Sequence, residues 1–215
     1  MRLFRGEGQA DRSRRAALTT EAGGQGVANL VRSAARQWKQ DQRTHAYRGH
    51  QRRAGQYGLG GLIDDLYMVR RDGLEAVFAQ AMQSVGITCE QLDNNMVQGY
   101  PDFKLSYEGC PNIIVEVKSR ESETTLVSHN SAVEVLSAAI LCGNKDTFCV
   151  TLCSPGVEPN VPSHIEACGL LSVVEVSDLA EAIIRVYERK LTIEELFDWF
   201  CTPGIATKAD LPATL

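Results

Sequence analysis

Three residues able to perform acid–base and electrostatic chemistry stand at short spacing in the middle of the chain. Asp102 follows a proline, and Glu116 and Lys118 belong to the apolar run NIIVEVKS. Side chains alternate between the two faces of a β-strand, so a strand over this run places Glu116 and Lys118 on one face, beside Ile114. Charged side chains within a valine- and isoleucine-rich strand cost free energy unless another group uses them. The pattern therefore indicates a functional site.

The position of Asp102 relative to this strand follows from a predicted hairpin. The run DFKLSY, which begins with Asp102, is separated from NIIVEVKS by EGCP, a turn signal. If the two runs pair as antiparallel strands, Asp102 lies opposite residues 117–118. Two carboxylates and one ammonium group then meet at one point of the sheet.

Such a group of side chains suits the metal-assisted hydrolysis of a phosphodiester. Asp102, Glu116 and the backbone carbonyl of Val117, together with waters, are oxygen ligands that fit Mg²⁺ or Mn²⁺. A bound ion of this kind polarises the phosphodiester and lowers the pKa of a bound water. Lys118 is expected either to orient or to deprotonate the attacking water and to offset charge in the transition state.

Each of these residues also has an ordinary structural interpretation. Asp102 can serve only to cap a turn after the proline. Glu116 and Lys118 can form the solvated face of a strand, since alternation alone produces such pairs. The coincidence of all three residues favours the hydrolytic site over these separate explanations.

The side chains of the site need a sheet supported by helices, and hydrophobic periodicity predicts one. The strand–helix–strand step between residues 112 and 153 requires a crossover connection, which indicates a mixed α/β sheet flanked by helices. The predicted order is helix 74–85, ended by Gly86, strands 87–92, 102–107 and 112–119, helix 131–141, strands 147–153 and 170–176, and helices 178–190 and 192–201.

The motif and its context together resemble a known superfamily. Gly99-Tyr-Pro-Asp102, thirteen intervening residues and Glu116-Val-Lys118-Ser resemble the PD-(D/E)XK, or restriction-endonuclease-like, nucleases. The resemblance covers roughly residues 70–155. It implies a restriction-endonuclease-like αβββαβ core with a mixed central sheet, to which the last helices of this chain are C-terminal additions.

The resemblance also implies a further acidic residue on the helix before the core strands. Glu75 occupies that place and is the candidate for a second metal ligand or for holding a metal-bound water. An alternative stays open, because a glutamate in the first turn of a helix is also favoured there by the helix dipole.

Three more residues are candidates for contact with nucleic acid. Ser119 and Arg120 extend the strand that carries Lys118, although Arg120 equally suits an exposed position without a role. Asn130 precedes a helix and either faces the site or only caps that helix. Glu134 is assigned to a capping box with Ser131, in the pattern S-x-x-E, and is left out of the predicted site.

The distribution of charge divides the chain. Residues 1–55 carry 12 basic and 4 acidic residues, a net charge of +8, whereas the remainder carries 10 basic and 23 acidic residues, a net charge of −13. The predicted organisation is a basic, partly disordered and partly helical arm over 1–57, a nuclease domain over 58–203 and a tail over 204–215. The arm suits either a polyanion or an acidic partner, or it is simply a solvated tail.

Two observations bear on the compartment. The chain has no run near the ~18 apolar residues of a membrane span, and its N-terminus lacks the apolar segment of a secretory signal. The cysteines are seven, an odd number, and no two are spaced as C-x-x-C, which indicates reduced thiols. A cytoplasmic protein without a membrane partner is therefore expected.

These patterns predict a Mg²⁺- or Mn²⁺-dependent phosphodiesterase, most simply an endodeoxyribonuclease acting on DNA, with RNA left open. No P-loop of the form G-x-x-x-x-G-K-[ST] is present, so a helicase or ATPase is the expected protein partner. The resemblance implies a 5′-phosphate product and, by analogy, the nuclease subunit of a bacterial defence or DNA-processing complex. A homo-oligomer stays open. The alternative hypothesis is a non-catalytic module with a nuclease fold that binds partners or nucleic acid.

Overall fold

The computed structural model describes residues 30, 33–34, 37–93, 99–122, 125–158 and 165–213. The chain divides into two compact units, Met1–Gln42 and Arg43–Leu215. In the first unit, residues 37–42 are helical, and the Gln37 amide donates a hydrogen bond to Asp41. Most of the predicted basic arm lies outside the described residues. The second unit contains the sheet and the candidate site.

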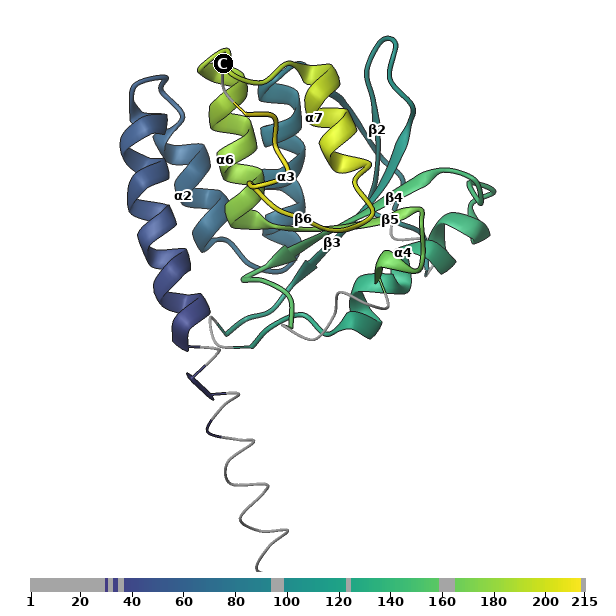
Figure 1. Ribbon diagram of the computed structural model, residues 1–215. Helices are drawn as coiled ribbons and strands as arrows, with labels where there is room; N and C mark the ends of the chain where they lie inside the picture. Colours follow the sequence, from purple (N-terminus) through teal and green to yellow (C-terminus); the bar gives the residue numbers. More distant parts are fainter. Residues whose placement is uncertain are drawn as a thin grey trace, which may run out of the picture. The chain divides into compact units, whose positions relative to one another are not determined.

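Six strands form one mixed sheet in the order β1-β2-β3-β4-β5-β6 (Figure 1). The strands are β1 (Thr88–Gln91), β2 (Phe103–Ser106), β3 (Ile113–Ser119), β4 (Phe148–Ser154), β5 (Leu171–Glu175) and β6 (Gly204–Ala206). β1, β2 and β3 pair antiparallel, whereas β3, β4, β5 and β6 pair parallel. The sheet therefore changes from antiparallel to parallel at β3.

Helices lie on both faces of this sheet (Figure 1). The helices are α2 (Gly60–Met68), α3 (Asp72–Ser84), α4 (His129–Leu141), α6 (Val176–Tyr187) and α7 (Ile193–Phe200). Buried residues of α2, α3, α6 and α7 pack in one large core cluster with one face of the sheet. Buried residues of α4 pack in a smaller cluster against the other face. Within the described residues, no helix is both long and apolar enough to cross a membrane.

The order of elements confirms the predicted fold class. Helix α3, three antiparallel strands, helix α4 and strand β4 follow one another as expected, and α6 and α7 are the C-terminal helical additions. Gly86, with a φ of 86°, follows the end of α3 in the left-handed region that glycine tolerates best. The connection from β3 through α4 to β4 joins parallel neighbours, as the predicted crossover requires.

The predicted C-terminal tail is partly a strand of the sheet. Residues 204–206 form β6, with Val173 of β5 opposite Ile205, and Leu211 beyond it is buried. The Trp199 indole N–H donates a hydrogen bond to the Thr207 carbonyl and fixes this segment to α7. A strand of three residues is too short to show the period-two alternation by which strands are recognised, so this strand was not predicted.

The boundary at the N-terminal side also differs from the prediction. The second unit begins at Arg43 rather than at residue 58, and residues 43–55 are helical. Ala54 is fully buried and His50 nearly so. This segment lacks an apolar period because polar contacts, rather than an apolar face, hold it against the rest of the unit.

Those contacts centre on the buried carboxylate of Glu181 in α6. Its oxygens lie 3.0 Å from His50 Nε2, 2.6 Å from Arg53 and 2.8 Å from Arg185. Arg53 also donates two hydrogen bonds of 2.8 Å to Glu188. Burial alone would raise the pKa of Glu181, but the three partners lower it far below its ordinary value. Glu181 is therefore an ionised anchor between the helix over 43–55 and α6.

Removing the charge of Glu181 should destabilise the second unit. We expect Glu181→Gln to lower the free energy of unfolding by about 1–3 kcal/mol, because it removes the buried charge that accepts hydrogen bonds from His50 and from the half-buried guanidinium groups of Arg53 and Arg185. Urea denaturation measures this change. The matched change Glu194→Gln, at an exposed position of α7, should stay within about 0.5 kcal/mol. Equal effects of the two variants would contradict the anchoring role.

Candidate active site

The candidate site lies where β2 begins and β3 ends. Phe103 pairs with Val115 and Leu105 with Ile113, and continuing this register places Asp102 beside Glu116. The hairpin predicted from the sequence places Asp102 one to two residues further along β3, opposite residues 117–118. The hairpin pattern specifies the pairing of the two runs but leaves the length of the turn between them open, and this length sets the register.

A direct hydrogen bond joins Asp102 to β3. The Val117 amide N–H donates to Asp102 Oδ2 at 2.6 Å. Asp102 itself is only 8% exposed. Its carboxylate is therefore held against the strand that carries Glu116 and Lys118, as the sequence predicts.

The alternation of side chains along β3 is confirmed. Val115 and Val117 belong to the large core cluster, whereas Ile114 belongs to the cluster under α4. Glu116 and Lys118, in register with Ile114, have side chains that are 13% and 25% exposed. They are too buried to be an ordinary solvated strand face.

Lys118 lies between two carboxylates. Its Nζ is 2.6 Å from Glu116 Oε1 and 2.9 Å from Glu134 Oε2 on α4. Burial alone would lower the pKa of Lys118, but the hydrogen bonds and charges of Glu116 and Glu134 outweigh it and raise the pKa. Lys118 is therefore an ammonium group, which donates hydrogen bonds and does not accept a proton.

The contact with Glu134 corrects an assignment made from the sequence. The predicted capping box between Ser131 and Glu134 is not formed, because Ser128 is the N-cap of α4 and its Oγ accepts from the Ser131 N–H. The helix begins two residues earlier than predicted, which leaves Glu134 in the body of the helix, facing Lys118. The S-x-x-E pattern predicts the wrong N-cap because Ser128, three residues before Ser131, occupies that position.

The surroundings of Asp102 favour its protonated form. Burial, followed by the charge of Glu116, raises the pKa of Asp102 to about 7, and the charge of Glu75 adds to this effect. The Val117 N–H and the charge of Lys118 act in the opposite direction. Asp102, Glu116 and Glu75 therefore lie within electrostatic reach of one another. Glu75, half-buried in the first turn of α3, keeps its predicted supporting role as a proposal.

The three candidates for nucleic-acid contact occupy different environments. Ser119 Oγ accepts a hydrogen bond of 3.0 Å from the backbone N–H of Arg71. The Arg120 guanidinium donates to Ser131 Oγ at 3.1 Å, which ties the end of β3 to α4. Asn130 is exposed on the first turn of α4 and is not the cap of that helix.

The donor groups fit a hard divalent cation. Glu116 Oε1 accepts from Lys118, while Oε2 is buried and has no hydrogen-bond partner in the part of the chain that the structure describes. Asp102 offers the second carboxylate. No three His, Cys, Asp or Glu side chains among the described residues group closely enough to hold an ion by themselves. A carbonyl, such as that of Val117, and waters would have to complete the shell, as is common for Mg²⁺.

Comparison with known proteins gives a likeness at the level of structure alone. No protein-family model and no curated protein sequence matches the chain. Among solved structures, the restriction endonuclease FokI is similar with a TM-score of 0.49, and FokI bound to DNA with a TM-score of 0.48. Both are 14% identical over 65% of this chain, which spans only 30% and 29% of the FokI chains. The order and directions of the strands establish a mixed α/β sheet flanked by helices, independently of this likeness.

The pKa of Asp102 predicts a dependence of stability on pH in metal-free buffer. Its value of about 7 exceeds the ~3.9 of an unfolded aspartate. Protonated Asp102 therefore adds to the free energy of unfolding below pH ~4, and this contribution is lost as the pH rises to ~7. Asp102→Asn lacks this ionisation. We expect its stability relative to wild type to rise by about 1.4 kcal/mol per pH unit across that window and then level off.

Thermal or urea unfolding in EDTA, at a series of pH values, measures this difference. The asparagine keeps an oxygen that can accept from the Val117 N–H, so the change tests the charge rather than the hydrogen bond. A constant difference between the two proteins from pH 4 to pH 8 would contradict the raised pKa.

Proposed function

We propose that this chain is a divalent-metal-dependent nuclease that hydrolyses DNA phosphodiester bonds. One observation carries the proposal: Asp102, Glu116 and Lys118 converge at the junction of β2 and β3, and a buried oxygen of Glu116 is left without a hydrogen-bond partner among the described residues. Buried polar atoms are normally satisfied, so this oxygen supports a cation site. The PD-(D/E)XK pattern of the sequence agrees with it.

The residues of the site have distinct roles in this proposal. Asp102, Glu116 and the Val117 carbonyl hold Mg²⁺ or Mn²⁺, with Glu75 in support. The ion supplies Lewis-acid chemistry, polarising the phosphoryl oxygen and lowering the pKa of water. The N–H of Val117 orients Asp102 so that its carboxylate is fixed before substrate arrives.

Lys118 stabilises charge rather than removing a proton. Because its pKa is raised, it stays an ammonium group at neutral pH and donates hydrogen bonds to the attacking water or to the phosphoryl oxygens. A preorganised cation stabilises the charge that develops in the transition state. Of the two roles expected from the sequence, orientation of water therefore fits this geometry better than deprotonation.

The wider role is part of the same proposal. Hydrolysis of this kind leaves a 5′-phosphate in the nucleases that the motif resembles, and the chain has no P-loop of its own. We propose that a helicase or ATPase supplies strand opening or target choice within a cytoplasmic bacterial defence or DNA-processing complex.

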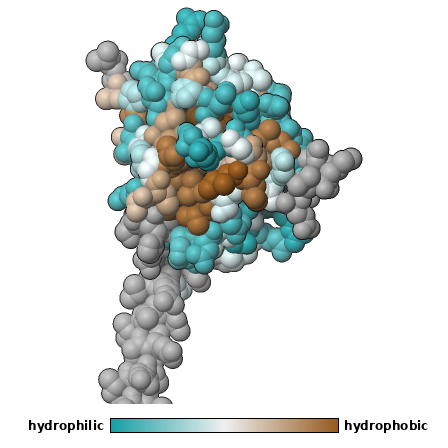
Figure 2. All heavy atoms as spheres, turned by 90° about the vertical axis from the view of Figure 1, so that its right-hand side faces the viewer, coloured by the Kyte–Doolittle hydropathy of each residue, from teal (hydrophilic) through white to brown (hydrophobic). Residues whose placement is uncertain are grey.

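Figure 2 shows an apolar area on the side where α4 ends, and Ile140 and Leu141 at that end are exposed. Such an area suits a protein partner or a second copy.

A nuclease assay tests the proposal. We expect wild type to cut plasmid or single-stranded DNA with Mn²⁺ or Mg²⁺ but not in EDTA. Lys118→Met and Asp102→Asn should each reduce the rate by at least about 10²-fold, the size of effect seen when a transition-state donor is removed. Lys145→Met, at an exposed position after α4, should cut like wild type. Cutting that survives both site variants, or that needs no metal, would reject the assigned site.

Glu134 is expected to act through Lys118. Glu134→Gln can keep a hydrogen bond to Lys118 but loses the negative charge that helps to raise its pKa. If the ammonium form is the active one, the loss of activity at high pH should begin at a lower pH in this variant. The pH dependence of kcat measures the shift, and identical alkaline limbs for the two proteins would remove Glu134 from the site.

A further inference from the structure

A polar cavity adjoins the proposed active site at the end of β3. Its volume is about 370 Å³, and it is lined by Arg71, Ser119, Arg120, Glu121, Ser122 and Thr125. Ser119 is the last residue of β3 and Arg120 follows it, so the cavity lies at the end of the strand that carries Lys118, and the Ser119 side chain leaves the strand on the face opposite to Lys118. Among the described residues, its lining consists of guanidinium, hydroxyl and carboxylate side chains, which suits a charged, hydrogen-bonding ligand.

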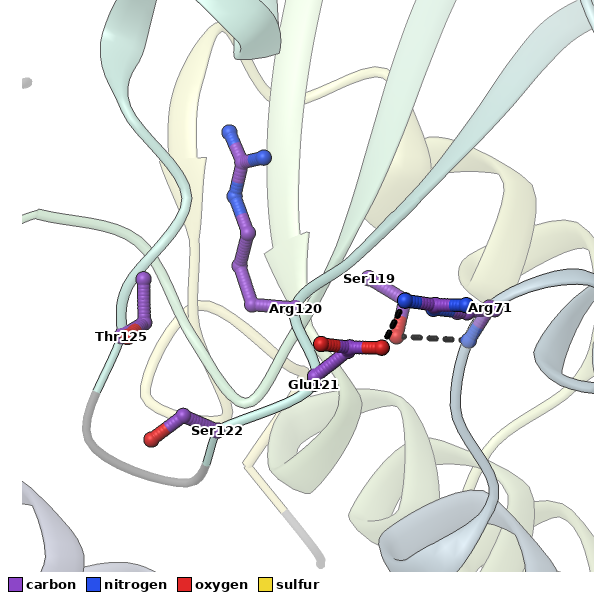
Figure 3. Close-up of a pocket in the computed structure, with 6 residues that line it drawn as sticks. All are labelled: Arg71, Ser119, Arg120, Glu121, Ser122 and Thr125. Atoms are coloured by element: carbon purple, nitrogen blue, oxygen red, sulfur yellow. Dashed lines mark hydrogen bonds and ion pairs between the residues drawn. The ribbon is translucent and has the colours of Figure 1, made fainter.

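The lining residues are arranged around one accessible cation. Figure 3 shows Arg71, Ser119 and Glu121 meeting on one side of the cavity, with Ser122 and Thr125 across from them. The Arg120 guanidinium points away from this group and is engaged with Ser131. Among the described lining residues, Arg71 is therefore the cation that faces a ligand.

The backbone holds Arg71 in a conformation that favours glycine. Its φ is 56° and its ψ is −143° at the N-cap of α3, a combination that costs free energy for any residue with a Cβ atom. The Arg71 N–H donates to Ser119 Oγ at 3.0 Å, and its carbonyl accepts from the Leu74 N–H at 2.8 Å. The two hydrogen bonds, the second of which also starts α3, fix the direction in which the Arg71 side chain leaves the backbone.

The partner of Arg71 in this structure is replaceable. Its guanidinium forms an ion pair with Glu121, and the two side chains are 67% and 69% exposed. An ion pair this exposed contributes little stability. A phosphate group offers the guanidinium two parallel charge-assisted hydrogen bonds. Because the ion pair is exposed, a phosphate can replace Glu121 at little cost in stability, and the hydroxyl groups of Ser119 and Thr125 offer further donors.

We infer that this cavity binds a backbone phosphate of the DNA strand, next to the phosphodiester that is cut, with Arg71 as the main ligand. This inference rests on the proposed function for its substrate. A contact of this kind carries no sequence information, but it fixes the position of the strand relative to Lys118. Glu121 competes with the phosphate for Arg71 and so weakens binding to DNA.

The test measures binding separately from cutting. A short fluorescent DNA duplex is titrated with the full chain in EDTA at several salt concentrations, and anisotropy reports the affinity. We expect Arg71→Gly to weaken binding at least about tenfold, as loss of a hydrogen bond to a charged group does. The slope of log affinity against log salt should fall by about 0.9, the value for one phosphate contact. Glu121→Gln should bind more tightly than wild type.

A matched control is available at Arg189. This residue is also an exposed arginine with a positive φ, of 58°, but it follows the C-terminal end of α6. Arg189→Gly makes the same chemical change and should keep the wild-type affinity and salt slope. Arg71→Gly should also retain or raise the melting temperature, because glycine suits the backbone there. A loss of binding then cannot come from unfolding.

The outcomes separate this inference from the proposed function, because metal-dependent cutting by wild type is assayed in parallel. If wild type cuts DNA but Arg71→Gly and Arg189→Gly bind with the same affinity and slope, the phosphate site is rejected and the nuclease stands. If wild type does not cut but DNA binding depends on Arg71, the phosphate site stands and the nuclease is rejected. No binding of DNA by wild type at low salt overturns the inference.

Discussion

The hydrogen bond from the Val117 N–H to Asp102 is the contact on which the site depends. It holds the carboxylate of Asp102 beside β3, in reach of the charge of Glu116. Two carboxylates in so little water repel each other, and the raised pKa of Asp102 expresses that repulsion together with burial. Lys118 compensates part of the charge by its contact with Glu116. A divalent cation would compensate the remainder, which is the physical basis of the proposed function.

The sheet explains why these groups meet at this place. β3 is the strand at which antiparallel pairing changes to parallel pairing, and its neighbours in the sheet are β2 and β4. Helices cover both of its faces. From the large core side, α3 brings Glu75 towards Asp102. From the other side, α4 brings Glu134 to Lys118. The Arg71 N-cap of α3 lies against the end of the same strand. Each side chain of the candidate site thus comes from β3 itself or from an element beside it.

The sequence predicted what depends on local periodicity. The alternation in NIIVEVKS placed Glu116 and Lys118 together because a strand permits only two directions for a side chain. The order of helices and strands followed from apolar spacing in the same way. The register of Asp102 depends on the length of the turn before β3. The contact between Glu134 and Lys118 depends on where α4 begins. Strand β6 is too short to show an alternating pattern. None of these has a periodic signature of its own.

The helix over 43–55 was missed for a related reason. It is held by the polar network of His50, Arg53 and Glu181 rather than by an apolar face. Polar residues with this pattern are typical of a solvated arm, and only the partner residue on α6, more than a hundred positions away, shows that they are buried. Long-range ion pairs of this kind leave no trace in the local sequence.

The binding of a divalent cation by the free protein tests the central claim most directly. Calorimetric titration of Mn²⁺ at pH 8 should show saturable binding to wild type. Asp102→Asn should weaken this binding by at least about tenfold, the loss caused even by removing groups that only support metal ligands. Glu90→Gln, at an exposed position of β1, should bind like wild type. Absence of saturable binding by wild type, or equal affinity in Asp102→Asn, would contradict the account.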